Sequence, residues 1–169
     1  KELFLRWSEM AVFTPVMRTH EGNRPDTNFQ YYEDEDCMGQ LARLVDIYTM
    51  LAPYMKTLVK ENAEKGIPVQ RPLFLHHEED KRAYAIQYEY LLGRDLLVAP
   101  VYLEARENWD VYLPEGEWVY LWTGDPYQGG DVNVDAPLGY TPAFYLRDSE
   151  YAPLFEEIRR KYGTGAVTD

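Results

Sequence analysis

Charged, imidazole and amide side chains gather in one short stretch near the amino end of the chain. The stretch Val12–Pro25 reads VFTPVMRTHEGNRP and directly follows an apolar segment. Arg18 can hold an anionic ligand or pair with a buried carboxylate. His20 can donate a hydrogen bond to a ligand hydroxyl, act as a general base oriented by Glu21, or simply cap the loop. The residues by themselves therefore predict a polar ligand site whose candidates are Arg18 and His20.

Two other polar clusters are weaker candidates for chemistry. His76 and His77 begin the run HHEED, but neighbouring residues on a strand point to opposite faces, so we interpret this run as a solvated hairpin end rather than a metal site. The acidic run Glu33–Asp36 can supply a helix N-cap at Asp34 or Asp36, a calcium site or a substrate-facing lid. EF-hand spacing is absent, which favours the N-cap.

The elements that must position the polar stretch are predicted to be a helix and a short strand. Residues 2–13 predict an amphipathic helix because Leu3, Trp7 and Met10 follow helical spacing. Pro15 ends that helix. Val16–Arg18 then predicts a buried strand whose carboxyl end opens onto the polar residues, which is where sites form in parallel α/β folds.

Two more helices are predicted after a long loop over residues 21–36. The second of them begins at Pro53, which fits a first helical turn, and Gly66 followed by Pro68 stops it. The first of them begins near Cys37. Its predicted apolar stripe consists of Met38, Leu41, Ala42, Val45, Tyr48, Leu51 and Ala52.

Beyond Pro68 the sequence changes to short β-rich segments that predict an antiparallel sandwich. Residues 82–94 fit either a strand or a short helix, Leu154 and Ile158 predict a closing helix, and residues 163–169 predict a frayed tail. The predicted strands lie in 69–75, 95–101, 109–114, 117–122, 132–137 and 143–146, with turns at 114–116, 123–125 and 129–131.

Composition limits the classes of partner. The chain has 169 residues and a net charge of −12, which disfavours nucleic acid and anionic membranes. No apolar run approaches the roughly 20 residues of a membrane span, and the amino end lacks signal-peptide architecture. Cys37 is the single cysteine, so an intrachain disulfide is excluded, and a cytoplasmic enzyme fits. The chain begins at Lys1 inside a helical pattern, and we expect it to be part of a longer protein.

Several motifs resemble one enzyme family. The segment RWSEMAVFTPVMRTH is similar to the end of the catalytic barrel in family 31 glycoside hydrolases, which include α-glucosidases and α-xylosidases. The blocks LLVAP, YLPEGEW and WTGDPYQGG resemble, in order and spacing, the β-sandwich that follows this barrel. The resemblance extends from about residue 3 to residue 150.

One departure within the resemblance concerns the polar stretch. Common α-glucosidases carry R-N-H-N where this chain reads Arg18-Thr19-His20-Glu21, and the form THEGNRP is most similar to the sulfoquinovosidase branch of the family. The resemblance implies that His20 hydrogen-bonds a sugar ring hydroxyl and that Arg18 lies near the catalytic carboxylates. It also implies a retaining mechanism with two aspartates, both upstream of this segment, so we expect the chain alone to be inactive.

Together, the residues and the resemblance predict an α/β plus β fold. Residues 1–66 would complete a (β/α)8 barrel, residues 67–150 would form an antiparallel β-sandwich, and residues 151–169 would add a helix and tail. The predicted function is part of a sulfoquinovosidase, with an α-glucosidase or α-xylosidase, or a non-catalytic carbohydrate-binding or structural sandwich module, as alternatives. The predicted partners are a glycoside and the upstream barrel, without nucleic acid, membrane, metal or cofactor.

Overall fold

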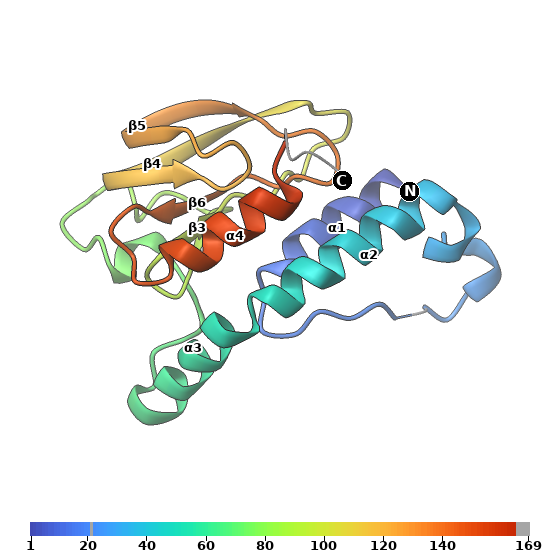
Figure 1. Ribbon diagram of the computed structural model, residues 1–169, viewed down its shortest axis with the longest axis horizontal. Helices are drawn as coiled ribbons and strands as arrows, with labels where there is room; N and C mark the ends of the chain where they lie inside the picture. Colours follow the sequence, from blue (N-terminus) through green and yellow to red (C-terminus); the bar gives the residue numbers. More distant parts are fainter. Residues whose placement is uncertain (21, 165–169) are drawn as a thin grey trace.

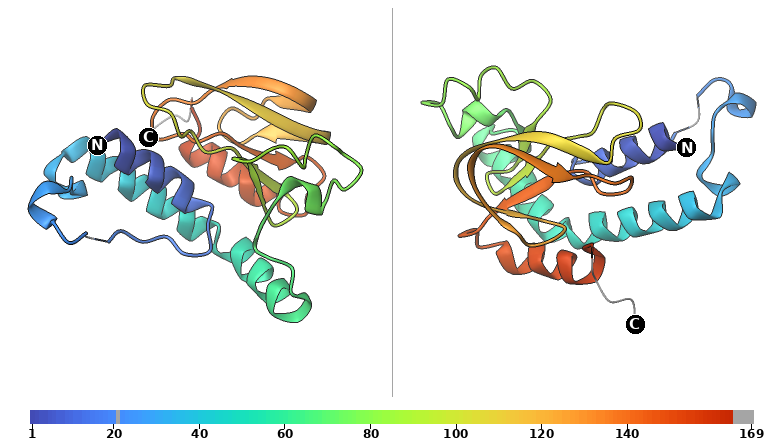
Figure 2. Two further views of the ribbon diagram at one scale, coloured as in Figure 1. Left: turned by 180° about the vertical axis from the view of Figure 1, so that it is seen from behind. Right: turned by 90° about the horizontal axis from the view of Figure 1, so that it is seen from above.

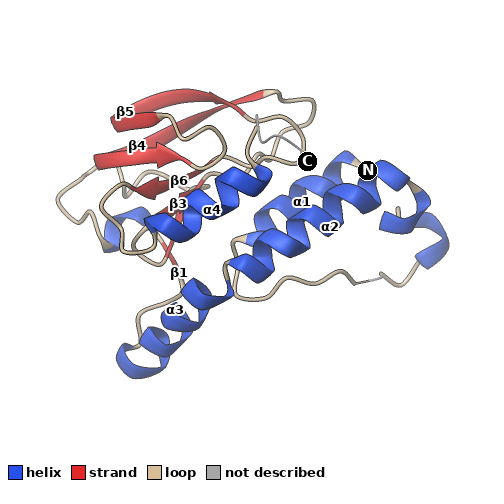
Figure 3. Ribbon diagram, viewed as in Figure 1, coloured by secondary structure: helices blue, strands red, loops and turns tan. Residues whose placement is uncertain are grey.

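The computed structural model describes residues 1–20 and 22–164, which form a helical region and a β region (Figure 1). The helical region covers residues 1–66 and the β region covers residues 67–164. Figure 3 shows the strands confined to the β region. The described helices are α1 (Glu2–Val12), α2 (Glu35–Met50), α3 (Ala52–Lys65), α4 (Ala152–Tyr162) and the 3-10 helices η1 (Pro25–Thr27), η2 (Tyr31–Glu33) and η3 (Leu73–Leu75).

Local sequence signals place the helix ends correctly. Helix α1 spans the predicted segment to within one residue, but its predicted apolar face is wrong, since Leu3 and Trp7 are exposed and Leu5 is buried instead. At the start of α2, the carboxylate of Asp34 accepts the Cys37 backbone N–H at 2.8 Å. The N-cap interpretation of the acidic run is therefore confirmed. Gly66 ends α3 in the left-handed conformation at φ 71°, as predicted from its position before Pro68.

The apolar stripe predicted for α2 is wrong, because it does not lie on the face of the helix that packs inward. Met38 and Val45 from that stripe are exposed. Helix α2 has apolar side chains on more than one face, and periodicity alone does not tell which face meets the rest of the chain. The face that packs inward carries Cys37, Leu44, Ile47 and the following Leu51.

The β region is built on one antiparallel sheet. Its strand order is β1-β2-β3-β6-β4-β5, so the antiparallel prediction is confirmed, while the six strands form a single sheet rather than two separate ones. In Figure 1 the β4–β5 hairpin lies above β6 and β3, and α4 packs against β6. The strands are β1 (Gln70–Arg71), β2 (Tyr90–Leu92), β3 (Leu96–Val98), β4 (Asn108–Tyr120), β5 (Pro126–Asp135) and β6 (Ala143–Leu146).

Two predicted turns are in fact parts of long strands. The residues 114–116 lie inside β4, where the register with β5 shifts between Leu113 and Glu117. The indole of Trp118 donates to the Pro114 carbonyl at 2.9 Å across this irregularity. The predicted turn at 129–131 lies inside β5 opposite the same point. The remaining predicted turn, at 123–125, is confirmed, since it connects β4 to β5.

The remaining predictions have mixed outcomes. The ambiguous segment 82–94 contains turns followed by strand β2, and the closing helix is confirmed as α4. The predicted tail lies outside the described residues from 165 onward. Within residues 1–20 and 22–164, none of the helices combines the length and apolar character needed to cross a membrane.

Candidate functional site

Arg18 and His20 lie on an extended segment that follows α1. Both side chains are exposed, and the predicted strand at Val16–Arg18 is wrong for this chain, since residues 16–20 have no regular secondary structure. A strand needs a neighbour to hydrogen-bond, and no described strand lies beside this segment. In Figure 1 the segment runs below α1 and α2, on the side away from the sheet.

Two tyrosine hydroxyls donate hydrogen bonds to the backbone at the start of this segment. Tyr90 of β2 donates to the Phe13 carbonyl at 3.1 Å, and Tyr48 of α2 donates to the Pro15 carbonyl at 2.9 Å. Beyond these anchors Val16 is 68% exposed. The chain therefore fixes where the segment begins and leaves the side chains of Arg18 and His20 exposed. Glu21, the proposed orienting partner of His20, lies outside the described residues.

A buried ion pair ties α1 to the β region. Arg6 and Glu9 are almost fully buried, and their charged groups lie 3.1 Å apart. Arg6 also donates to the carbonyls of Arg106 at 2.7 Å and Ala136 at 3.0 Å, and Glu9 accepts the Gly139 backbone N–H. Burial raises the pKa of the Glu9 carboxyl, while the Arg6 guanidinium opposes that rise. The pair thus sets the position of the helix that leads to Arg18 and His20.

Helix α2 reaches the same loop of the β region. Arg43 donates to the Gly139 carbonyl, and its guanidinium lies 4.1 Å from the centre of the Tyr140 ring. A Cβ at Gly139 would lie 2.7 Å from the Gln40 side-chain oxygen and 2.8 Å from an Arg43 guanidinium nitrogen, so a larger residue would displace these two side chains. Sequence reasoning missed this junction. No local pattern indicates it, because the residues that it joins lie 130 positions apart along the chain.

His76 belongs to a polar cluster around buried Arg71, and both histidines are half-buried, so the interpretation of this run as fully solvated is wrong. His76 ends the 3-10 helix η3, and its Nε2 lies 2.8 Å from the guanidinium of buried Arg71. Arg71 also pairs with Glu61 of α3. Burial lowers the pKa of both His76 and His77. The described part of the chain holds no group of three or more His, Cys, Asp or Glu side chains placed to bind a metal ion.

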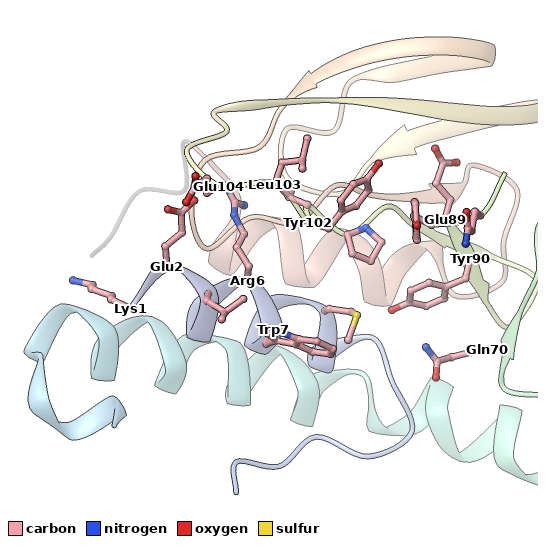
Figure 4. A pocket seen from close by; sticks show the side chains of 16 residues that line it. Lys1, Glu2, Arg6, Trp7, Gln70, Glu89, Tyr90, Tyr102, Leu103 and Glu104 are labelled. Atoms are coloured by element: carbon pink, nitrogen blue, oxygen red, sulfur yellow. The ribbon is translucent and has the colours of Figure 1, made fainter. Parts of the chain in front are cut away.

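A groove of about 830 Å³ separates α1 from the loops that flank β2 and β3 (Figure 4). Trp7 lines one side, and Tyr88 and Tyr102 line the other. Aromatic faces beside polar groups are typical of sugar-binding clefts and also of protein interfaces. Glu89 borders the groove, and burial raises the pKa of its carboxyl to about 7.

The comparisons with known proteins agree with this architecture. Residues 66–149 match the family described as the glycosyl hydrolase family 31 C-terminal domain. The sulfoquinovosidases of Escherichia coli (strain K12) and Agrobacterium fabrum (strain C58) are each 52% identical to this chain, covering 94% of it and 24% of their own length. A solved structure of a family 31 sulfoquinovosidase from E. rectale, in complex with an aza-sugar inhibitor, is 71% identical with a TM-score of 0.95. It matches 96% of this chain and 24% of its own. The chain thus spans about a quarter of the length of these relatives.

Proposed function

The chain belongs to glycoside hydrolase family 31, and on that basis we propose that it is the carboxyl-terminal part of a retaining α-glycosidase that hydrolyses α-sulfoquinovosides. The observation that carries this proposal is the identity of 71% to a sulfoquinovosidase, sustained over 96% of the chain. The form THEGNRP around Arg18 and His20, which departs from common α-glucosidases and resembles the sulfoquinovosidase branch, supports the same proposal.

In this proposal, residues 1–66 complete a (β/α)8 barrel whose other strands and helices lie upstream. The extended segment after α1 would then become the last barrel strand, paired with strands that this chain lacks. Its exposure supports the proposal, since 68% of Val16 is open to a covering partner. His20 would hydrogen-bond a hydroxyl of the sugar ring, and Arg18 would lie beside the catalytic carboxylates.

The chemistry is divided between the two parts of the enzyme. Retaining hydrolysis uses one carboxylate as the nucleophile and another that protonates the leaving oxygen and then activates water. We propose that both aspartates lie upstream, so the 169-residue chain contributes binding and positioning alone. Carboxylates and water suffice for this reaction, so the proposal includes no cofactor.

The charge of the chain is compatible with an anionic substrate. A net charge of −12 repels sulfonates at long range. Arginine and lysine side chains placed close to the sulfonate overcome this repulsion locally, and we propose that they are supplied upstream. A cytoplasmic location stays a prediction.

The proposal is tested by assaying the full-length enzyme with an α-sulfoquinovoside and the matching α-glucoside. We expect kcat/KM to favour the sulfoquinovoside by about 1000-fold or more, since a site built to pair a charged group rejects a ligand that lacks it. Preference for the neutral sugar would favour the α-glucosidase or α-xylosidase alternative. Absence of turnover with any glycoside would favour a non-catalytic module.

A further inference from the structure

The groove beside α1 has the character of an interface between protein segments. On the α1 side, Leu3 and Trp7 are exposed at i, i+4 spacing, and Met10 continues the same face. On the opposite side Tyr88, Tyr102 and Leu103 are exposed as well. Exposed apolar side chains facing one another across a groove mark a surface that another segment covers.

The aromatic wall of the groove is already ordered. The rings of Tyr88 and Tyr102 lie 4.7 Å apart in a tilted arrangement, and Tyr102 meets Trp109 edge to face at 4.9 Å. These contacts hold the Tyr102 side chain in one position although 58% of it is exposed. Ordered aromatic side chains lose little conformational entropy when a partner covers them.

The position of the groove indicates what covers it. Helix α1 packs against α2 on one flank (Figure 2), and its other flank faces the groove (Figure 4). In a (β/α)8 barrel the helices form a ring around the strands, and consecutive helices are neighbours in that ring. If α1 and α2 are the last two ring helices, the free flank of α1 belongs to the helix that comes before α1 in the chain.

We propose that this groove is the docking site of the barrel helix immediately upstream of α1 in the full-length enzyme. That helix would present an apolar face to Trp7 and, unlike an ordinary ring neighbour, would also contact Tyr88 and Tyr102 of the β region. About three quarters of the length of the relatives lies outside this chain, which provides ample sequence for such an occupant. The inference rests on the proposed barrel and adds that one upstream helix joins the barrel to the β region.

Hydroxyl-radical footprinting of the full-length enzyme tests the docking. Trp7, Tyr88 and Tyr102 are 61%, 56% and 58% exposed in this chain, and Tyr84, which lies outside the groove, is 57% exposed. We expect the three groove residues to oxidise about tenfold more slowly than in the denatured enzyme, since a packed neighbour excludes water, and Tyr84 to change much less. If the groove residues and Tyr84 are slowed equally relative to the denatured enzyme, the inference is overturned.

Other occupants give different results in the same experiment. Protection that appears only at high protein concentration would assign the groove to a second copy, and protection that appears only with added α-sulfoquinovoside would assign it to a ligand. Either result overturns the docking of an upstream helix. Turnover of the same sample reports the proposed function separately, so an active enzyme with an open groove rejects the docking alone.

A variant pair sharpens the test. Tyr102→Ala removes the centre of the aromatic wall, and we expect it to raise the oxidation rate of Trp7 several-fold while the substrate preference is unchanged. Tyr84→Ala removes an equally exposed tyrosine outside the groove and should leave the Trp7 rate unaltered. Equal effects of the two variants on Trp7 would overturn the inference.

Discussion

The tryptophans of the two regions have contrasting surroundings. In the β region, Trp118 and Trp122 are buried, and their indole N–H groups donate to the carbonyls of Pro114 at 2.9 Å and Thr141 at 2.7 Å. In the helical region, Trp7 is 61% exposed. Trp118 and Trp122 thus find their partners within the β region, whereas the side chain of Trp7 is directed outward from the helical region.

This difference teaches where the chain depends on other parts of the enzyme. Contiguous exposed apolar side chains mark a surface that a partner covers. The exposed examples in the described part of the helical region are Leu3, Trp7, Val16, Tyr32, Met38, Val45 and Val59. The same region carries Arg18 and His20, so the candidate site lies on the side of the chain that needs completion.

The largest effect is expected where the two regions meet. Arg6→Met would leave the carboxylate of Glu9 buried without a cation, at an expected loss of about 3–5 kcal/mol in unfolding free energy. Urea denaturation of the full-length enzyme measures this loss. Arg82→Met, which breaks the exposed pair with Asp131, is the matched control and should have a much smaller effect. Similar losses in the two variants would contradict a buried junction.

A smaller effect, on activity alone, is expected in the extended segment. His20→Ala should lower kcat/KM of the full-length enzyme about 100-fold, the value of one strong hydrogen bond to the sugar, without lowering Tm. His77→Ala removes the same side chain from the β region and should leave kcat/KM unchanged. Steady-state kinetics and thermal unfolding of both variants separate binding from stability. A shared loss of Tm would contradict a binding role for His20.

Alanine substitutions at one glycine in each region test how tightly that region is packed. A Cβ at Gly129 in β5 would lie 2.9 Å from backbone atoms of Pro114 and Glu115, so Gly129→Ala should destabilise the enzyme by about 1–3 kcal/mol. Gly39 in α2 has nothing within 4 Å, and Gly39→Ala should stabilise by up to about 1 kcal/mol. Thermal unfolding checks the signs. A destabilising Gly39→Ala would show that upstream structure packs tightly there.

The smallest effect depends on pH. Burial raises the pKa of Glu89 from 4.5 to about 7 and Asp131 adds to the rise, while Arg82 and the Tyr112 N–H oppose it. Because the folded enzyme favours the protonated form, the stability that Glu89 contributes below pH 4.5 is lost as the pH rises through 7. Glu89→Gln should therefore be about 1 kcal/mol more stable than the parent above pH 7 and nearly equal to it at low pH. The measurement is the Tm of the parent, of Glu89→Gln and of the control Glu115→Gln from below pH 4.5 to above pH 7. If Glu89→Gln and the parent show the same pH dependence of Tm, the prediction is contradicted.

Local signals in the sequence were sufficient for part of the fold. The extent of α1, the Asp34 cap and the Gly66 stop each depend on a few neighbouring residues, and all three are confirmed. The apolar face predicted for α1 is wrong for this chain, since Leu3 and Trp7 are exposed. Strand β4 was predicted as two strands because Pro114–Gly116 carries turn chemistry. The structure accommodates those residues as a bulge, opposite Gly129. Which strand lies opposite is not visible in local sequence.

The candidate site, like the fold, could be predicted from the sequence only in part. Arg18 and His20 were selected from residue type and resemblance, and their roles stay predictions. The Arg6–Glu9 junction joins residues about 130 positions apart, so no local pattern indicates it. The strand predicted at Val16–Arg18 was wrong because a strand forms only beside partners, and the described chain supplies none there.

The role of His20 is tested most directly by a crystal structure of the full-length enzyme with a sulfoquinovose-derived inhibitor bound. We predict a ring nitrogen of His20 within about 3.2 Å of a hydroxyl of the sugar ring, on a strand that the upstream barrel completes. A bound inhibitor beyond hydrogen-bond reach of His20, with the segment after α1 still exposed to solvent, would contradict the proposed site.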